Sequence, residues 1–267
     1  MFYDEDTVTD QPQRQIAAEI IREKGTNGER EMAYMLYLAG FDVKDVTMTD
    51  LISGRETLED INMVVYCGGF SNSDVLGSAK GWAGSFLFNP KAKAALDNFY
   101  AREDTLSLGV CNGCQLMMEL GLITPEDKKK GKMLHNDSHK FESNFLGVTV
   151  PMNRSVMFGS LSGSKLGIWV AHGEGKFSLP YPEDHYNVVL KYSYDEYPGN
   201  PNGSDYSVAG IASQDGRHLA MMPHLERACF PWENAYYPLD RKDEDQITPW
   251  MEAFVNARKW VEAHKKA

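Results

Sequence analysis

Residues 106–121, LSLGVCNGCQLMMELG, place a cysteine among closely spaced glycines, a pattern suited to nucleophilic chemistry. An alternating apolar run predicts a buried strand, and the second half predicts a helix that ends at Gly121. Cys111 falls on the turn between them, with Gly109 and Gly113 two residues to either side. Such a turn is typical of a nucleophile elbow, which presents one side chain at the carboxyl end of a sheet. The amino end of the helix then favours the thiolate, the reactive form of cysteine.

Cys111 and Cys114 also form a C-x-x-C pair, which is found in redox dithiols and as half of a zinc site. Zinc requires two further ligands, and the remaining cysteines, Cys67 and Cys229, are isolated in the sequence. A third interpretation is that both members of the pair are small buried apolar residues. We favour a nucleophile at Cys111, because the turn is sharp and a candidate base exists elsewhere. We expect Cys114 to pack inside the helix.

The candidate base lies in MMPHLER, residues 221–227, where His224 and Glu226 follow an apolar run. A cysteine nucleophile needs a base that takes up its proton and returns it to the leaving group, and a third group that orients the imidazole. On an extended segment, residues i and i+2 point to the same side, so the Glu226 carboxylate can contact the His224 ring. By itself the pair is a weak signal, because any exposed strand end can carry it.

Two glycine-containing turns are further candidates. Gly68-Gly69 ends a predicted strand, and its backbone N–H groups suit an oxyanion hole, although an ordinary loop turn is the alternative. If this strand and the one before Cys111 are neighbours, both end at the sheet edge where α/β proteins bind ligands. HGEG, residues 172–175, sets two glycines beside His172, which we interpret from the residues alone as a structural loop histidine rather than a catalytic one.

Composition limits the class of protein. The chain has 267 residues with 42% hydrophobic and 24% charged residues, which is ordinary for a globular protein. We expect a polar arm or linker at 1–14 and one domain over 15–267. The net charge of −11 argues against a nucleic-acid surface. No apolar run approaches the roughly 20 residues of a membrane helix. Four cysteines without a signal peptide predict reduced thiols in the cytoplasm.

Strands alternating with helices in the first half predict an open, mostly parallel sheet flanked by helices. Thr26 and Glu29 form a predicted capping box for the first helix, and Asn89 with Pro90 begins a helix that reaches about Arg102. Predicted strands occupy residues 15–21, 41–48, 62–67 and 105–110 in the first half, and 145–150, 155–159, 166–175, 187–194, 207–216 and 218–224 in the second.

The last helix is predicted to begin with Thr248 as its cap and Pro249 at its first position. Its apolar face comprises Trp250, Phe254, Ala257 and Val261.

Taken together, GVCNGCQ, PHLER, CGGFS and HGEG resemble the class I glutamine amidotransferase family. Within it, REKGTNGEREMA, CGGFSNSDVLGSAKGWAGSFLFN, AHGEGKF, NPNGS and PWMEAFVNARKW are most similar to the glutaminase domains of phosphoribosylformylglycinamidine synthases, in the version fused to the end of a large synthase. The likeness covers roughly residues 16 to 262. It implies a flavodoxin-like α/β fold with additional strands in the second half.

The resemblance also implies roles for residues. Cys111 would be the nucleophile, His224 the base and Glu226 its orienter, while the backbones of Gly69 and Asn112 would donate to the oxyanion. The residues implied at the glutamine site are Gly68, Phe70, Gln115, His172, Gly173 and Glu174.

The implied reaction hydrolyses glutamine to glutamate and supplies ammonia to a phosphoribosylformylglycinamidine synthetase domain, on the same longer chain or a separate subunit. ATP and magnesium are expected only in that partner, and this domain is expected to need no metal or cofactor and to bind neither nucleic acid nor membrane. Another class I amidotransferase, a cysteine hydrolase of the same fold, or a C-x-x-C redox or zinc module are the alternatives.

Three features depart from the family pattern. Leu225 stands where the family has proline, Asn72-Ser73 replace an aromatic-glycine pair, and the acidic start before residue 15 has no counterpart.

Overall fold

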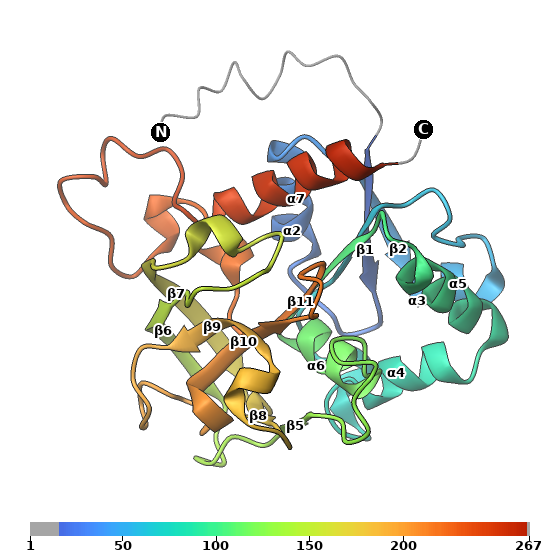
Figure 1. Ribbon diagram of the computed structural model, residues 1–267, viewed down its shortest axis with the longest axis horizontal. Coiled ribbons are helices and arrows are strands. Elements are labelled where there is room, and N and C mark those ends of the chain that lie inside the picture. The colour runs from blue at the N-terminus through green and yellow to red at the C-terminus, as the bar shows by residue number, and fades with distance from the viewer. Residues whose placement is uncertain (1–15, 266–267) are drawn as a thin grey trace.

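A nine-stranded sheet forms the centre of the computed structural model, which describes residues 16–265 (Figure 1). Its strand order is β2-β1-β3-β4-β11-β10-β9-β6-β7. The first five of these are parallel: β2 (Asp42–Thr47), β1 (Ala17–Arg22), β3 (Met63–Tyr66), β4 (Leu106–Val110) and β11 (His218–Met221). The predicted α/β class is therefore confirmed, and the predicted arm at 1–14 lies outside the described residues.

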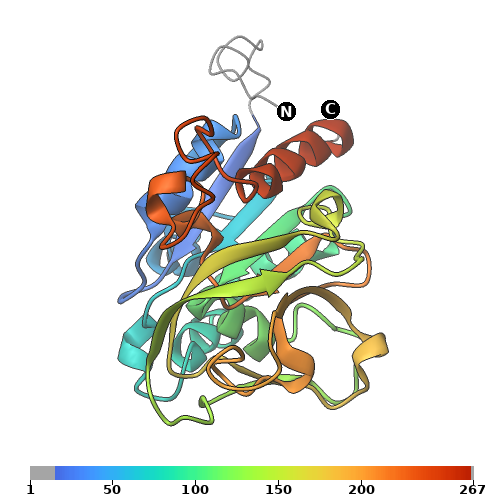
Figure 2. The same cartoon turned by 90° about the vertical axis from the view of Figure 1, so that its left-hand side faces the viewer.

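The additional strands of the second half extend the same sheet in antiparallel fashion. They are β10 (Val208–Ala212), β9 (Asn187–Tyr192), β6 (Glu142–Thr149) and β7 (Lys165–His172). Figure 2 shows β6 and β7, in yellow-green, at the edge that faces the viewer. A separate two-stranded ribbon joins β5 (Lys132–Leu134) to β8 (Lys176–Ser178).

Two groups of helices flank the parallel strands (Figure 1). On one side, α2 (Glu29–Leu38) contacts α7 (Met251–His264). On the other, α4 contacts both α5 and α6, and α3 contacts α5. The bounds of this second group are α3 (Met48–Ser53), α4 (Lys80–Leu87), α5 (Pro90–Ala101) and α6 (Asn112–Glu119). None of the helices in residues 16–265 is long and apolar enough to span a membrane.

One predicted strand is wrong. Residues 155–159 form turns that lead into a 3-10 helix, Gly159–Leu161, instead of extended backbone. The Ser155 hydroxyl accepts hydrogen bonds from the N–H groups of Met157 and Phe158, at 3.2 and 3.3 Å. This local side-chain bond stabilises a turn and competes with strand formation.

The helix-start predictions succeed at one helix and fail at another. Asn89 caps α5 as expected, because its side chain accepts from the N–H groups of Lys91 and Ala92, both at 3.0 Å. The predicted capping box at Thr26 is wrong: α2 begins after Gly28, and the Thr26 hydroxyl donates to the Glu23 carbonyl instead.

The last helix begins two residues later than predicted, at Met251. Thr248 nevertheless accepts a hydrogen bond from the Trp250 N–H at 3.3 Å and donates to the Ala228 carbonyl at 2.7 Å. The predicted apolar face is confirmed, since Trp250, Phe254, Ala257 and Val261 are all buried.

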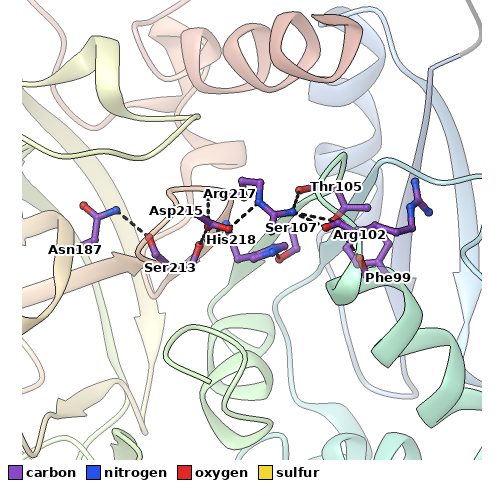
Figure 3. A network of polar contacts seen from close by, with 9 residues as sticks. All are labelled: Phe99, Arg102, Thr105, Ser107, Asn187, Ser213, Asp215, Arg217 and His218. Carbon is purple, nitrogen blue, oxygen red and sulfur yellow. Dashed lines mark hydrogen bonds and ion pairs between the residues drawn. The ribbon is translucent and has the colours of Figure 1, made fainter. Parts of the chain in front are cut away.

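The amino ends of β4 and β11 are joined by a partly buried polar network (Figure 3). Ser107 on β4 and His218 on β11 lie 3.0 Å apart, between Oγ and Nδ1. Arg217 donates to the backbone carbonyls of Arg102 and Thr105 at 2.7 and 3.2 Å. This network ties the two halves of the chain together at the end of the sheet opposite the candidate site.

Candidate active site

Cys111 occupies the sharp turn that the sequence predicts. It lies between β4 and α6 with φ 53° and ψ −106°, a conformation that non-glycine residues rarely adopt. The flanking glycines are required for space: a Cβ at Gly109 would lie 2.5 Å from the Gly113 carbonyl oxygen, and one at Gly113 would lie 2.0 Å from the Tyr66 oxygen. α6 therefore packs directly on the sheet, and the thiol is held at the carboxyl edge of β4.

The fold brings His224 to the same edge. β11 pairs in parallel with β4, with Met221 opposite Val110, and the Cys111 N–H donates to the Met221 carbonyl at 2.9 Å. The residues after β11 thus run beside the cysteine. The His224 N–H in turn donates to the Trp169 carbonyl at 2.9 Å, which fixes this segment against β7.

Glu226 contacts the His224 ring, but not for the reason predicted. Residues Leu225–Arg227 form a 3-10 turn rather than an extended segment, so the tight turn brings the carboxylate back to the ring. The His224 Nδ1 and Glu226 Oε1 atoms lie 2.7 Å apart, and both side chains are buried. Nδ1 is occupied by this contact, so Nε2 is the nitrogen available to Cys111.

The electrostatics of this trio favour an imidazolium. Burial lowers the pKa of His224, but the charges of Glu226 and Cys111 and hydrogen bonds to both raise it to about 10. A ring that keeps its proton near neutral pH stabilises a thiolate beside it. The arrangement can therefore hold a thiolate–imidazolium pair.

The Gly68-Gly69 turn also lies beside these residues. A Cβ at Gly68 would lie 2.9 Å from the His224 ring and 3.4 Å from the Cys111 Cβ, so Gly68 makes room for both. Within residues 16–265, the backbone N–H groups of Gly69 and Asn112 have no hydrogen-bond acceptor. Both amides are thus available to an oxyanion, as the resemblance implies.

A cavity of about 390 Å³ opens at the Cys111 thiol. Most of the residues implied at the glutamine site line it, whereas Gly68 does not. The lining residues are Gly69, Phe70, Asp74, Ser78, Cys111, Gln115, His135, His139, Lys140, Phe141, Ala171, His172, Gly173 and Glu174.

Hydrogen bonds join the loops that enclose this cavity. Gln115 donates to the Glu174 carbonyl at 2.8 Å and accepts from the Asn112 side chain at 2.9 Å. Asn112 in turn accepts from the Ser71 N–H at 3.0 Å. The Ser78 N–H donates to the Glu174 carboxylate at 3.2 Å. The residues after Gly69 are thus fastened to both α6 and the HGEG loop.

Known proteins match this chain along almost its whole length. Residues 15–261 match the profile of the CobB/CobQ-like glutamine amidotransferase domain. The chain belongs to this family. It is 44% identical to phosphoribosylformylglycinamidine synthase from Homo sapiens, over 91% of this chain and 20% of that protein. The probable chloroplastic/mitochondrial phosphoribosylformylglycinamidine synthase of Arabidopsis thaliana is also 44% identical, over 91% of this chain and 19% of that protein. The chain therefore spans about a fifth of the length of these relatives.

Solved structures agree with this assignment. PurLQS from Thermotoga maritima superposes with a TM-score of 0.67 and 26% identity, covering 94% of this chain and 100% of that chain. A glutamine amidotransferase from the same organism shares the fold at a TM-score of 0.55 and 16% identity, covering 94% of this chain and 100% of its own. The predicted family and its amidotransferase fold are confirmed, whereas the roles of individual residues stay predictions.

His172 of this amidotransferase domain is buried at the cavity wall. Neither ring nitrogen has a hydrogen-bond partner within residues 16–265. Burial, together with the nearby His224, lowers the pKa of His172 to about 3, so the ring is neutral near pH 7. The low pKa of His172 agrees better with a role in the binding loop than with a role as the general base. Asn202 stabilises the HGEG loop, because its side chain donates to the Gly175 carbonyl at 2.8 Å.

Cys114 lies inside α6 and is fully buried. Burial, with Cys111 nearby, raises the pKa of its thiol well above the usual range. In the part of the chain that the structure describes, no three His, Cys, Asp or Glu side chains are grouped as metal ligands. The geometry therefore offers a redox or zinc interpretation less support than a single reactive thiol at Cys111.

The departures from the family pattern leave the trio intact. Leu225 is buried, and the His224–Glu226 contact is kept. Asn72 and Ser73 adopt left-handed backbone with φ 52° and 56°, and Asp74 follows with φ 50°. Of these three, Asp74 lines the cavity, and strained backbone of this kind clusters at functional sites.

Four charged or titratable residues that line the cavity were not predicted from the sequence, namely Asp74, His135, His139 and Lys140. Asp74 lies in the segment after Gly69, where the departure from the family pattern was the only signal. The other three lie in one polar loop between two strands.

Proposed function

We propose that this chain is the glutaminase domain of a phosphoribosylformylglycinamidine synthase that acts in purine synthesis. The observation that carries the proposal is the cluster at the carboxyl edge of β4 and β11, where Cys111 lines a cavity from its elbow and interacts with the buried His224–Glu226 pair. The names of the relatives from Homo sapiens and Arabidopsis thaliana support the choice of synthase.

In the proposed reaction, the Cys111 thiolate attacks the carbon of the glutamine carboxamide. The C=O electron pair moves onto oxygen, and the N–H groups of Gly69 and Asn112 donate to that oxyanion. The protonated His224 transfers its Nε2 proton to the amide nitrogen, which leaves as ammonia when the C–N bond breaks. Glu226 holds the Nδ1 side of the ring and so fixes its orientation.

A glutamyl thioester on Cys111 remains. The neutral His224 then takes a proton from a water molecule, whose oxygen attacks the thioester carbon. Collapse of this second tetrahedral species breaks the C–S bond and releases glutamate. The thiolate and the imidazolium are restored, so the domain returns to its starting state.

The ammonia would serve a synthetase domain that uses ATP, magnesium and formylglycinamide ribonucleotide. The proposed synthetase corresponds to the part of the relatives that this chain does not span. No metal or cofactor is proposed for the glutaminase domain. The cytoplasmic location stays a prediction, since the relative from Arabidopsis thaliana is named chloroplastic/mitochondrial.

The proposal is tested by glutamate release and by covalent labelling. The purified chain should release glutamate from glutamine, alone or with the synthetase added. A chloroketone analogue of glutamine should label Cys111, and excess glutamine should protect it. Peptide mass mapping distinguishes Cys111 from Cys114. Labelling at Cys114 alone, or no glutamate release under either condition, would overturn the proposal.

A further inference from the structure

Arg227 follows the His224–Glu226 pair directly, and the reaction proposed above does not use it. Its guanidinium Nε lies 3.8 Å from Glu226 Oε1, the same carboxylate oxygen that contacts the His224 ring. The Arg227 side chain is 31% exposed, whereas the Glu226 side chain is 1% exposed. A partly exposed cation is thus paired with a carboxylate that solvent does not reach.

The negative charge of Glu226 has few compensating groups. Among residues 16–265 its ion-pair partners are His224 and Arg227, and its second carboxylate oxygen, Oε2, has no hydrogen-bond partner. A buried carboxylate without a compensating charge is destabilised. In the proposed reaction His224 gives its proton to the departing ammonia, so the ring is neutral once the thioester has formed. At that stage Arg227 is the cation that still neutralises Glu226.

The guanidinium of Arg227 is fixed by the turn before α2. Its Nη2 donates to the Asn27 side-chain oxygen at 2.7 Å, and its Nε lies 3.7 Å from Glu31 Oε1. Gly28 leaves room for this arrangement: a Cβ there would lie 3.1 Å from Arg227 Nη2 and 3.6 Å from Glu226 Oε1. Arg227 is therefore held by a short hydrogen bond at a position between two carboxylates.

The turn that holds Arg227 is itself fastened to the Gly68-Gly69 turn. The Asn27 N–H donates to the Gly68 carbonyl at 2.9 Å, and the Phe70 N–H donates to the Gly25 carbonyl at 2.8 Å. These backbone bonds lie on either side of Gly69, whose N–H is a proposed oxyanion donor. The anchor of the guanidinium is therefore placed by the same backbone that places that donor.

We propose that Arg227 is a positioning residue for the glutaminase reaction, which acts through Glu226 and stabilises its charge while His224 is neutral. This role rests on the proposed glutaminase function and adds a residue to it. Arg227 does not line the cavity, so it does not touch the substrate. Its substitution should therefore change kcat rather than the KM for glutamine.

Steady-state kinetics of glutamate release, with the chain alone or with the synthetase added, test this role. Arg227→Gln should lower kcat about tenfold and leave KM within about twofold, because a charged contact that matters after binding is lost. Arg227→Lys keeps the positive charge and should hold kcat within about threefold of the unmodified chain.

A double-mutant cycle with Glu226 separates this role from a loss of structure. In a Glu226→Gln background, Arg227→Gln should lower kcat less than about twofold further, since the charge that Arg227 stabilises is already absent. Asn27→Ala removes the anchor of the guanidinium but keeps the backbone bond to Gly68. It should lower kcat about threefold and add almost nothing to the effect of Arg227→Gln.

Arg102→Gln is the matched control. The Arg102 side chain is 26% exposed and forms an ion pair with Asp104 at 3.0 Å, so its setting is similar to that of Arg227. It donates to the carbonyls of Leu58 and Glu59 at 3.0 and 2.7 Å and does not line the cavity. Its substitution should lower stability and leave kcat within about twofold.

Three outcomes would overturn the role of Arg227. These are a normal kcat in Arg227→Gln, an equal loss from that substitution in the parent and Glu226→Gln backgrounds, or a loss of the same size in Arg102→Gln. Asn27 is exposed, so Asn27→Ala tests the role even if Arg227→Gln does not fold, and a normal kcat there would also exclude it. Failure of the proposed function is distinct: in that case the unmodified chain releases no glutamate and the glutamine analogue does not label Cys111.

Discussion

The two ends of β4 and β11 carry similar residue types in different settings. At the carboxyl end, Cys111 lies beside His224 and its partner Glu226. At the amino end, Ser107 lies 3.0 Å from the His218 ring, with Asp215 nearby, so serine, histidine and aspartate are all present (Figure 3). Of these residues, Cys111 alone lines the cavity described above.

The partners of each imidazole explain the difference. Asp215 is engaged by Arg217 at 2.8 Å and by the Ser213 hydroxyl at 2.6 Å. Burial lowers the pKa of His218 to about 4; Arg217 adds to this, and Asp215 opposes it. His224 has a buried carboxylate as its direct partner, and its pKa is raised to about 10. One ring is therefore neutral near pH 7 and the other carries a proton.

Backbone geometry separates the two ends as well. Ser107 lies within the strand, is fully buried and accepts a hydrogen bond from Tyr100 at 2.9 Å. Cys111 lies just beyond the strand on a turn, next to the Gly69 and Asn112 N–H groups, which have no acceptor among the residues that the structure describes. The residue types alone therefore do not make an active site. The backbone turn and the partner of the imidazole distinguish the carboxyl end from the amino end.

The largest expected difference in activity is between substitution of Cys111 and substitution of Ser107. Cys111→Ala should abolish glutamate release, because the covalent route is lost. Ser107→Ala should leave kcat within about twofold and lower stability by about 1 kcal/mol through lost hydrogen bonds. Steady-state kinetics and thermal denaturation of both variants measure these effects.

Cys114→Ala serves as the control for thiol chemistry and should keep much of the activity. An active Cys111→Ala together with an inactive Cys114→Ala would reverse our assignment of the nucleophile.

The second effect concerns the histidines. His224→Ala should reduce kcat roughly 10³-fold, in the range of general acid–base contributions. Glu226→Ala should cost less, roughly tenfold to hundredfold, because the ring remains but is poorly oriented. His218→Gln should leave kcat nearly unchanged. A normal kcat in His224→Ala would remove that residue from the mechanism.

Local pattern was sufficient for part of this site. The turn at Cys111 could be predicted because it depends on glycine spacing and on the change from a strand pattern to a helix pattern, which are both local in sequence. The cap at Asn89 could be predicted because it also depends on neighbouring residues. The capping box at Thr26 failed because a tertiary contact intervened: Thr26 pairs with Gly69 from another strand end.

Other parts depend on contacts between distant segments. Asp74 and Lys140 meet at one cavity only because Asn136 fastens its loop to the HGEG loop, and no sequence spacing records that. The contact between His224 and Glu226 was predicted, yet its backbone was not, since i and i+2 can approach on a tight turn as well as on a strand.

A third prediction uses pH to compare the two histidines. The folded pKa of His218, about 4, lies below its unfolded value near 6.5, so its contribution to stability is present above pH 6.5 and is lost as the pH falls to 4. The loss is about 3 kcal/mol. His224 has a raised pKa, so its contribution is present below pH 6.5 and is lost as the pH rises through 10.

Denaturant unfolding at several pH values tests this contrast. His218→Gln should flatten the acid-side decline between pH 6.5 and 4, and His224→Gln should flatten the alkaline-side decline. An unchanged acid-side slope in His218→Gln would show that this ring is not neutral in the folded protein.

The smallest expected effect is on coupling to a partner, and it should appear only at the carboxyl end. The segment after Gly69 is fastened to α6 through Ser71 and to the HGEG loop through Ser78, and it exposes Val75 and Leu76 at 80% and 72%. A synthetase that covers these apolar side chains could fix the segment in its active position. We expect the isolated chain to bind glutamine but turn over slowly, and the synthetase with its nucleotide and ribonucleotide substrates to raise glutamate release about tenfold or more. That factor is a coupling free energy of about 1.4 kcal/mol.

Val75→Ser should reduce the stimulation by the synthetase and leave the basal rate unchanged, because Val75 does not line the cavity. A chain that is equally fast with and without the synthetase would exclude this coupling while leaving the glutaminase chemistry at Cys111 in place.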